Sequence, residues 1–81
     1  KDDLLFDLIV DDGSHMIEHM ILSFNYLKKY VKVGGFYIIE DIRNVDMEIF
    51  NSLGSSDFEV VKMHIGTLNL QDSCIIYKRI S

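Results

Sequence analysis

Acidic residues follow two apolar runs of this chain in closely similar positions. The run FDLIV is followed by Asp11 and Asp12, and the run FYII is followed by Glu40 and Asp41. If the two runs are neighbouring parallel strands, they lie about 4.8 Å apart, and carboxylates at their ends repel unless one is protonated or a cation lies between them. A hard divalent ion such as Mg²⁺ or Ca²⁺, bound by oxygen atoms, resolves this repulsion. The pattern therefore predicts a metal site, and the alternative is a pair of turns in which Asp only caps the strand ends.

The first acidic pair divides into two candidate roles. Successive strand residues point to opposite faces, so Asp11 and Asp12 cannot both face one ion unless the backbone turns at Gly13. Asp12 is nearer to the turn and is the preferred metal ligand, with Asp41 at the equivalent place after the second run. Asp11 is left as a candidate cofactor-binding residue.

A histidine near the same turn is a candidate general base. His15 follows Asp12 by three residues and lies at or near the start of an expected helix. A helix N-terminus disfavours imidazolium, so a neutral His15 there can accept a proton, although a nearby anionic site acts in the opposite direction. A base beside a metal ion that polarises a hydroxyl is a coherent arrangement. The alternative is a polar residue at a helix start.

The same region also contains the spacing H-x-x-E-H of a class of zinc peptidases, formed by His15, Glu18 and His19. Residues four apart share a helix face, but a zinc peptidase needs a third protein ligand. The remaining histidine, His64, lies in an expected strand far along the chain. His15 would also occupy the frayed end of its helix, so we interpret His19 as a residue of the helix surface.

These residues need a strand, a helix and a second strand to hold them. Phe6–Val10 is typical of a strand that is buried on both faces. Ser14 is a reasonable N-cap for a helix whose apolar residues recur at steps of three and four, and Gly34–Gly35 is predicted to stop it. That apolar stripe consists of Met16, Ile17, Met20, Ile21, Phe24, Leu27 and Val31. A second strand is expected at Phe36–Glu40, so the segment has the length of a right-handed βαβ unit.

The rest of the chain predicts a shorter helix at about 46–53, ended by Gly54, and two more strands. The strands are expected at Phe58–Ile65 and Ser73–Ile80, and their connector is too short for a helical crossover, so the pair should be antiparallel. The predicted fold class is α/β: two parallel strands joined by a helix, followed by a helix and an antiparallel strand pair.

Composition excludes several classes of protein. The net charge of −5 argues against a surface for nucleic acids, and Lys28, Lys29 and Lys32 are expected to form a solvated face. No apolar run approaches the roughly 20 residues of a membrane span, and no signal peptide is visible. The single cysteine, Cys74, excludes an intrachain disulfide and favours a cytoplasmic setting. Because the chain begins at Lys1, we expect a piece of a longer protein.

The segments FDLIVDDGSH and KKYVKVGGFYIIEDI, with the closing strand pair, resemble the C-terminal half of a class I S-adenosylmethionine-dependent methyltransferase. They are most similar to the metal-dependent macrolide-sugar O-methyltransferases of the macrocin and mycinamicin type and to their relatives named cephalosporin hydroxylases. In that group the D-D-G-S-H turn and the E-D pair form the site. The chain has Val33 where the fold usually has proline before the two glycines.

By position, the resemblance implies Asp12 and Asp41 as ligands of Mg²⁺ or a similar divalent cation, Glu40 as a further ligand, and His15 as the base toward a hydroxyl acceptor such as a sugar. It implies a partial Rossmann-like sheet with S-adenosylmethionine as cofactor. It covers the chain from about Phe6 onward, but only half of the family's domain, because the glycine-rich loop after the family's first strand lies upstream.

Residues 1–81 are therefore expected to form a single partial domain that is inactive in isolation and binds S-adenosylmethionine weakly or not at all. Two other functions stay open. The chain is alternatively a non-catalytic half-domain that forms homo-oligomers through the open edge of its sheet, where an unpaired strand invites another chain. The third alternative is a zinc hydrolase that uses His15, Glu18 and His19.

Overall fold

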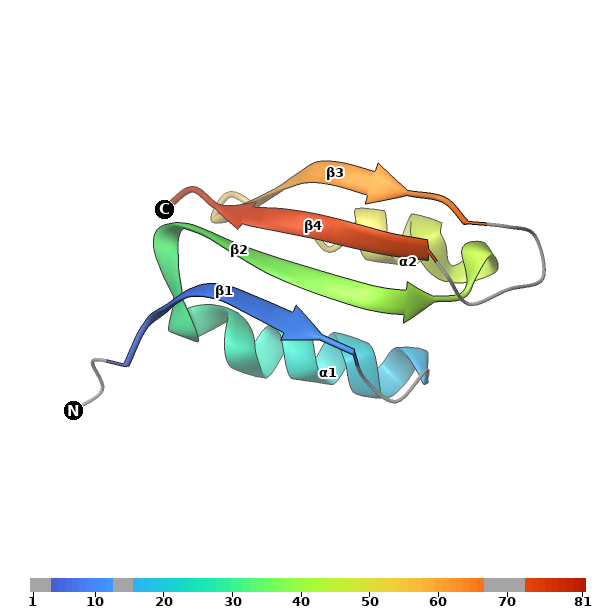
Figure 1. Cartoon of the computed structure of the whole chain (residues 1–81), viewed down its shortest axis with the longest axis horizontal. Helices are drawn as coiled ribbons and strands as arrows, with labels where there is room; N and C mark the ends of the chain where they lie inside the picture. The colour runs from blue at the N-terminus through green and yellow to red at the C-terminus, as the bar shows by residue number, and fades with distance from the viewer. Residues whose placement is uncertain (1–3, 13–15, 67–72) are drawn as a thin grey trace.

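A computed structural model describes residues 4–12, 16–66 and 73–81 of the chain (Figure 1). Within these residues, four strands, two α-helices and two short 3₁₀ turns follow one another as β1 (Phe6–Asp11), α1 (Ile17–Leu27), η1 (Lys28–Tyr30), β2 (Val31–Ile42), η2 (Asn44–Asp46), α2 (Met47–Asn51), β3 (Phe58–His64) and β4 (Ser73–Arg79). The small α/β fold expected from the sequence is confirmed. In the described part of the chain, no helix is long and apolar enough to cross a membrane.

The four strands form one mixed sheet in the order β1-β2-β4-β3. β1 and β2 are parallel and joined through α1, while β4 is antiparallel to both of its neighbours. The parallel pair and the antiparallel pair agree with the sequence prediction. The position of β4 between β2 and β3, which Figure 1 shows as the red strand beside the green one, was not predicted.

Both helices cover the same face of this sheet and bury one hydrophobic core. Its buried members come from both helices and from β2, β3 and β4: Met20, Phe24, Val31, Tyr37, Ile39, Ile42, Met47, Phe50, Phe58, Ile75 and Tyr77. Residues at every second position of the strands contribute, as the two-residue period of a strand requires. This core holds β2, and with it the second acidic pair, against the helices.

Phe24 of α1 lies at the centre of the core. Its ring meets Tyr37 and Phe58 edge-on, with centroids 5.0 and 5.7 Å away, and stacks on Tyr77 at 4.6 Å. Edge-to-face and offset-stacked rings are the arrangements that aromatic pairs prefer. One helix residue therefore contacts three strands of the sheet, since Tyr37, Phe58 and Tyr77 belong to β2, β3 and β4.

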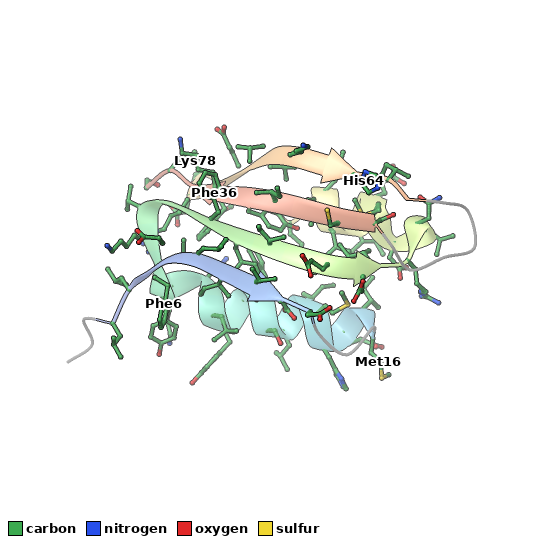
Figure 2. The ribbon with its side chains drawn as sticks, viewed as in Figure 1. Phe6, Met16, Phe36, His64 and Lys78 are labelled. Atoms are coloured by element: carbon green, nitrogen blue, oxygen red, sulfur yellow. The ribbon has the colours of Figure 1, made fainter. Side chains whose placement is uncertain are left out.

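The opposite face of the sheet is not covered by either helix, which corrects the prediction that Phe6–Val10 is buried on both faces. Leu8 and Val10 of β1 are 51% and 48% exposed. On the same face Phe36 of β2 lies beside Lys78 of β4 (Figure 2). Apolar strand residues indicate a covering layer, but the strand sequence alone does not say whether that layer is present.

The chain leaves α1 earlier than the periodic pattern predicted. The helix ends at Leu27, η1 follows, and Val31 already belongs to β2, so Gly34–Gly35 does not cap the helix. Gly34 has φ +93°, a conformation that glycine adopts without strain. A Cβ atom on Gly35 would lie 2.7 Å from the carbonyl oxygen of Asp7, so glycine here allows β2 to approach β1. The two glycines thus shape the start of β2.

The second helical segment is close to its prediction. Residues 46–53 were expected to be helical, and the structure has η2 followed directly by α2, which ends at Asn51. Met47 and Phe50 are buried against the sheet, which accounts for the short amphipathic pattern. This segment closes the core on the side of β4.

Candidate functional site

The carboxyl ends of β1 and β2 lie at the same edge of the sheet, because these strands are parallel neighbours (Figure 1). Their pairing ends with Asp11 opposite Ile39, so the next residues along the two strands are Asp12 and Glu40. The sequence prediction had matched Asp12 with Asp41, one residue further along. Both acidic pairs therefore lie at the same end of the sheet, and the register places Asp12 opposite Glu40, one residue before the predicted partner Asp41.

The second acidic pair occupies a β-bulge. Ile39 pairs with Ile75 and Ile42 pairs with Ser73, so β2 has one residue more than β4 between these two pairs. Asp41 has φ +58°, in the left-handed region that aspartate tolerates better than most residues. Bulges interrupt the alternation of a strand and redirect side chains, often beside functional sites. Here Ile39 and Ile42 both remain in the core, while Glu40 is exposed and Asp41 is half-buried.

Asp11 is held by a residue that the sequence prediction missed. The hydroxyl of Tyr37 donates a hydrogen bond to Oδ2 of Asp11, at 3.1 Å. Burial raises the pKa of Tyr37 strongly, and the negative charge of Asp11 raises it further, so the hydroxyl stays protonated and remains a donor. A tyrosine inside a buried strand run was the available signal, because a buried phenol usually finds a hydrogen-bond partner.

The predicted metal ligands suit a hard cation in chemical type, because carboxylate oxygens are what Mg²⁺, Mn²⁺ and Ca²⁺ prefer. Asp12 and Glu40 are exposed at the sheet edge and accessible to ions from solvent. However, within residues 4–12, 16–66 and 73–81, no three His, Cys, Asp or Glu side chains gather closely enough to hold a metal ion. Asp12, Glu40 and Asp41 therefore fit as part of a ligand set, and their role stays a prediction.

The histidines fall in three different places. His15, the predicted base, lies outside the described residues, together with Gly13 and Ser14. His19 is exposed on α1, which confirms its interpretation as a helix-surface residue. His64 is exposed near the end of β3 (Figure 2).

The chain is similar to macrolide-sugar O-methyltransferases over part of its length. It is 51% identical over 37 residues to demethylmacrocin O-methyltransferase of Streptomyces fradiae, and 53% identical over 36 residues to L-olivosyl-oleandolide 3-O-methyltransferase of Streptomyces antibioticus. It is 49% identical over 37 residues to mycinamicin VI 2''-O-methyltransferase of Micromonospora griseorubida.

These similarities cover 44–46% of this chain and about 9% of the length of each of those relatives. No protein-family model matches the chain. No solved structure matches it either. The resemblance expected from the sequence motifs is thus confirmed as a partial similarity.

Proposed function

We propose that residues 1–81 are a partial domain, the C-terminal half of an S-adenosylmethionine-dependent O-methyltransferase with a Rossmann-like sheet. The observation that carries this proposal is the 51% identity over 37 residues to an O-methyltransferase. The proposal is supported by the position of both acidic pairs at the carboxyl ends of the parallel strands, because open α/β sheets bind ligands beyond these ends. The acceptor would be a small molecule with a hydroxyl, of the sugar class, since an olivosyl group occurs in the name of one relative.

In this proposal Asp12 and Asp41, with Glu40, would supply part of the ligand set of a divalent cation, and Asp11 would contribute to binding the methyl donor. The cation would supply Lewis-acid polarisation of the acceptor hydroxyl. His15 takes the hydroxyl proton as the oxygen attacks the methyl carbon. The carbon–sulfur bond breaks, and the products are a methyl ether and S-adenosylhomocysteine. Holding these groups in line supplies much of the rate of such a transfer.

The cation site can be tested on the ¹⁵N-labelled chain with Mn²⁺, whose unpaired electrons broaden the signals of nearby amides. We expect the amides of Asp12, Glu40 and Asp41 to broaden at the lowest Mn²⁺ concentration and to recover when Mg²⁺ is added in excess. Glu59, near the start of the far-edge strand β3, is the internal reference. Equal broadening at Glu59 would mean general binding to an acidic surface and would contradict the site.

A calorimetric titration with S-adenosylmethionine tests the assignment to half a domain. The 81 residues contain no G-x-G pattern that would cradle the cofactor, so we expect weak binding or none. A dissociation constant in the micromolar range would show that the chain carries a complete donor site and would overturn the half-domain assignment.

A second candidate function is favoured by the exposed edge of β1. In the described sheet, β1 has a neighbour on one side only, and Phe6, Leu8 and Val10 are about half exposed. Such an edge pairs readily with another strand. In this second candidate function the chain is a non-catalytic half-domain, and two copies associate by pairing β1 of one copy with β1 of the other.

Light scattering during size-exclusion chromatography separates the two candidates. Self-association predicts a dimer that Leu8→Lys converts to monomer, because the charged side chain would lie in the new interface. Leu22→Lys is the matched control, since Leu22 is 69% exposed on α1, away from the sheet. A monomeric wild-type chain at high micromolar concentration would contradict the second candidate.

A further inference from the structure

Two tyrosines lie side by side in the core with hydroxyls that serve different partners. Tyr37 of β2 and Tyr77 of β4 are register partners, and both are fully buried. The hydroxyl of Tyr77 donates to the backbone carbonyl of Phe50, within the fold itself. The hydroxyl of Tyr37 donates instead to a carboxylate at the proposed site, that of Asp11. A phenylalanine at either position would fill nearly the same space, so each hydroxyl can be examined separately from core packing.

The bond from Tyr37 runs diagonally across the strand pair. Tyr37 lies opposite Ile9 in the parallel register, and its side chain reaches two residues further along β1 to Asp11. Diagonal neighbours in a sheet lie within reach of aromatic side chains. Asp11, Ile9 and Tyr37 therefore share the helix-covered face, and the bond connects the last paired residue of β1 to β2 three residues before Glu40.

A hydrogen bond from a phenol to a carboxylate is charge-assisted, and at 3.1 Å this one is longer than the usual distance of about 2.5–2.7 Å. It limits the orientations of the Asp11 side chain, which otherwise has three staggered χ1 positions. A carboxylate has about four lone-pair sites, and the Tyr37 hydroxyl uses one of them, so Asp11 keeps acceptor capacity for a ligand.

We propose that Tyr37 is a positioning residue, whose hydroxyl holds the Asp11 carboxylate in one orientation on the helix-covered face, at the end of the parallel strands where Asp12, Glu40 and Asp41 also lie. In this arrangement the Asp11 carboxylate stays turned toward the helix-covered face. The inference rests on the proposed function, because that function gives Asp11 its part in binding the methyl donor.

The test measures the side-chain orientation of Asp11 directly, through the three-bond couplings from its backbone nitrogen and carbonyl carbon to Cγ. We expect values typical of one χ1 rotamer in the wild-type chain and in Tyr77→Phe, and rotamer-averaged values in Tyr37→Phe. A loss of core packing would change the Asp11 couplings in both variants alike. A difference between the two variants therefore reports the effect of the Tyr37 hydroxyl on Asp11.

The two proposals can fail separately in this experiment. Unchanged Asp11 couplings in Tyr37→Phe would overturn the positioning role, whatever the chain does with metal ions. If Tyr37→Phe did not fold, averaged couplings in the wild-type chain would overturn it equally, and single-rotamer couplings would support it. Absence of Mn²⁺ binding in the wild type would reject the proposed metal site, while the couplings would still decide the role of Tyr37.

Discussion

Replacing Phe24 with alanine is expected to lower the free energy of unfolding by about 3–5 kcal/mol, the usual cost of deleting a large buried aromatic side chain. The chain has 81 residues, for which about 4–12 kcal/mol of total stability is typical. Phe24 is fully buried and contacts Tyr37, Phe58 and Tyr77 at once, so the cavity would open between α1 and three strands. We therefore expect the midpoint of urea denaturation of Phe24→Ala, followed by circular dichroism, to fall well below that of the wild type.

Leu22→Ala is the matched control for this variant. It removes an apolar side chain from the same helix, but Leu22 is 69% exposed, so the change in stability should stay within about 0.5 kcal/mol. A loss below about 1 kcal/mol in Phe24→Ala would show that the aromatic cluster does not form the centre of the core.

Asp12→Asn and Asp41→Asn should each weaken the binding of Mn²⁺ by about 10- to 100-fold or more, the range found for residues that only support metal ligands. At a Mn²⁺ concentration 100 times the wild-type dissociation constant, the ion stabilises the wild type by about 2.7 kcal/mol. The same concentration would stabilise the variants by only about 0.4–1.4 kcal/mol. Asparagine tolerates the left-handed conformation of residue 41, so this substitution tests the charge and not the backbone.

Glu59→Gln is the control for the lost charge. It removes one negative charge from an exposed position at the far edge of the sheet, so it should retain the full stabilisation by Mn²⁺. The stabilisation by Mn²⁺ is measured from the thermal unfolding of the wild type and the three variants, each with and without Mn²⁺. An equal loss of Mn²⁺ stabilisation in Glu59→Gln would show that Mn²⁺ binding depends on the net charge of the chain and not on the strand-end carboxylates.

The element types could be predicted from the sequence because each apolar run was short, distinct and bounded by polar residues or glycine. The end of α1 could not, because residues 28–35 satisfy two patterns at once. Val31 continues the helical stripe, yet it is also the first residue of β2, where it is fully buried. The 3₁₀ turn η1 redirects the chain just before it, and short 3₁₀ turns at helix ends leave little trace in a hydrophobic pattern.

The layers and the strand order depend on contacts between distant parts of the chain. The sequence of β1 is typical of a strand that is buried on both faces, but among the described residues helices cover only one face of the sheet. In the same way, no local feature of β4 indicates that it enters between β2 and β3.

The site could be predicted in its outline but not in its detail. Parallel pairing was enough to bring the acidic residues of both strands to one edge. The register of β1 against β2 shifted the expected match by one residue, because the pairing of the two strands, and not the end of each apolar run, sets which residues lie opposite each other. The bulge at Asp41 was not predicted either, because an extra residue in a strand has no clear sequence signature without glycine. Tyr37 was missed for a different reason. It fits the apolar pattern of a buried strand, and that pattern gives no sign of the partner of its hydroxyl.

The central place of β4 determines when this fold can form during synthesis. A ribosome completes β2 and β3 before β4, but in the finished sheet these two strands pair only through β4. A nascent chain that ends at residue 66 would lack Ile75 and Tyr77 and would leave the inner edges of β2 and β3 unpaired. Such edges associate readily with other chains. Productive folding of this unit therefore waits for Ser73–Arg79 to leave the ribosome.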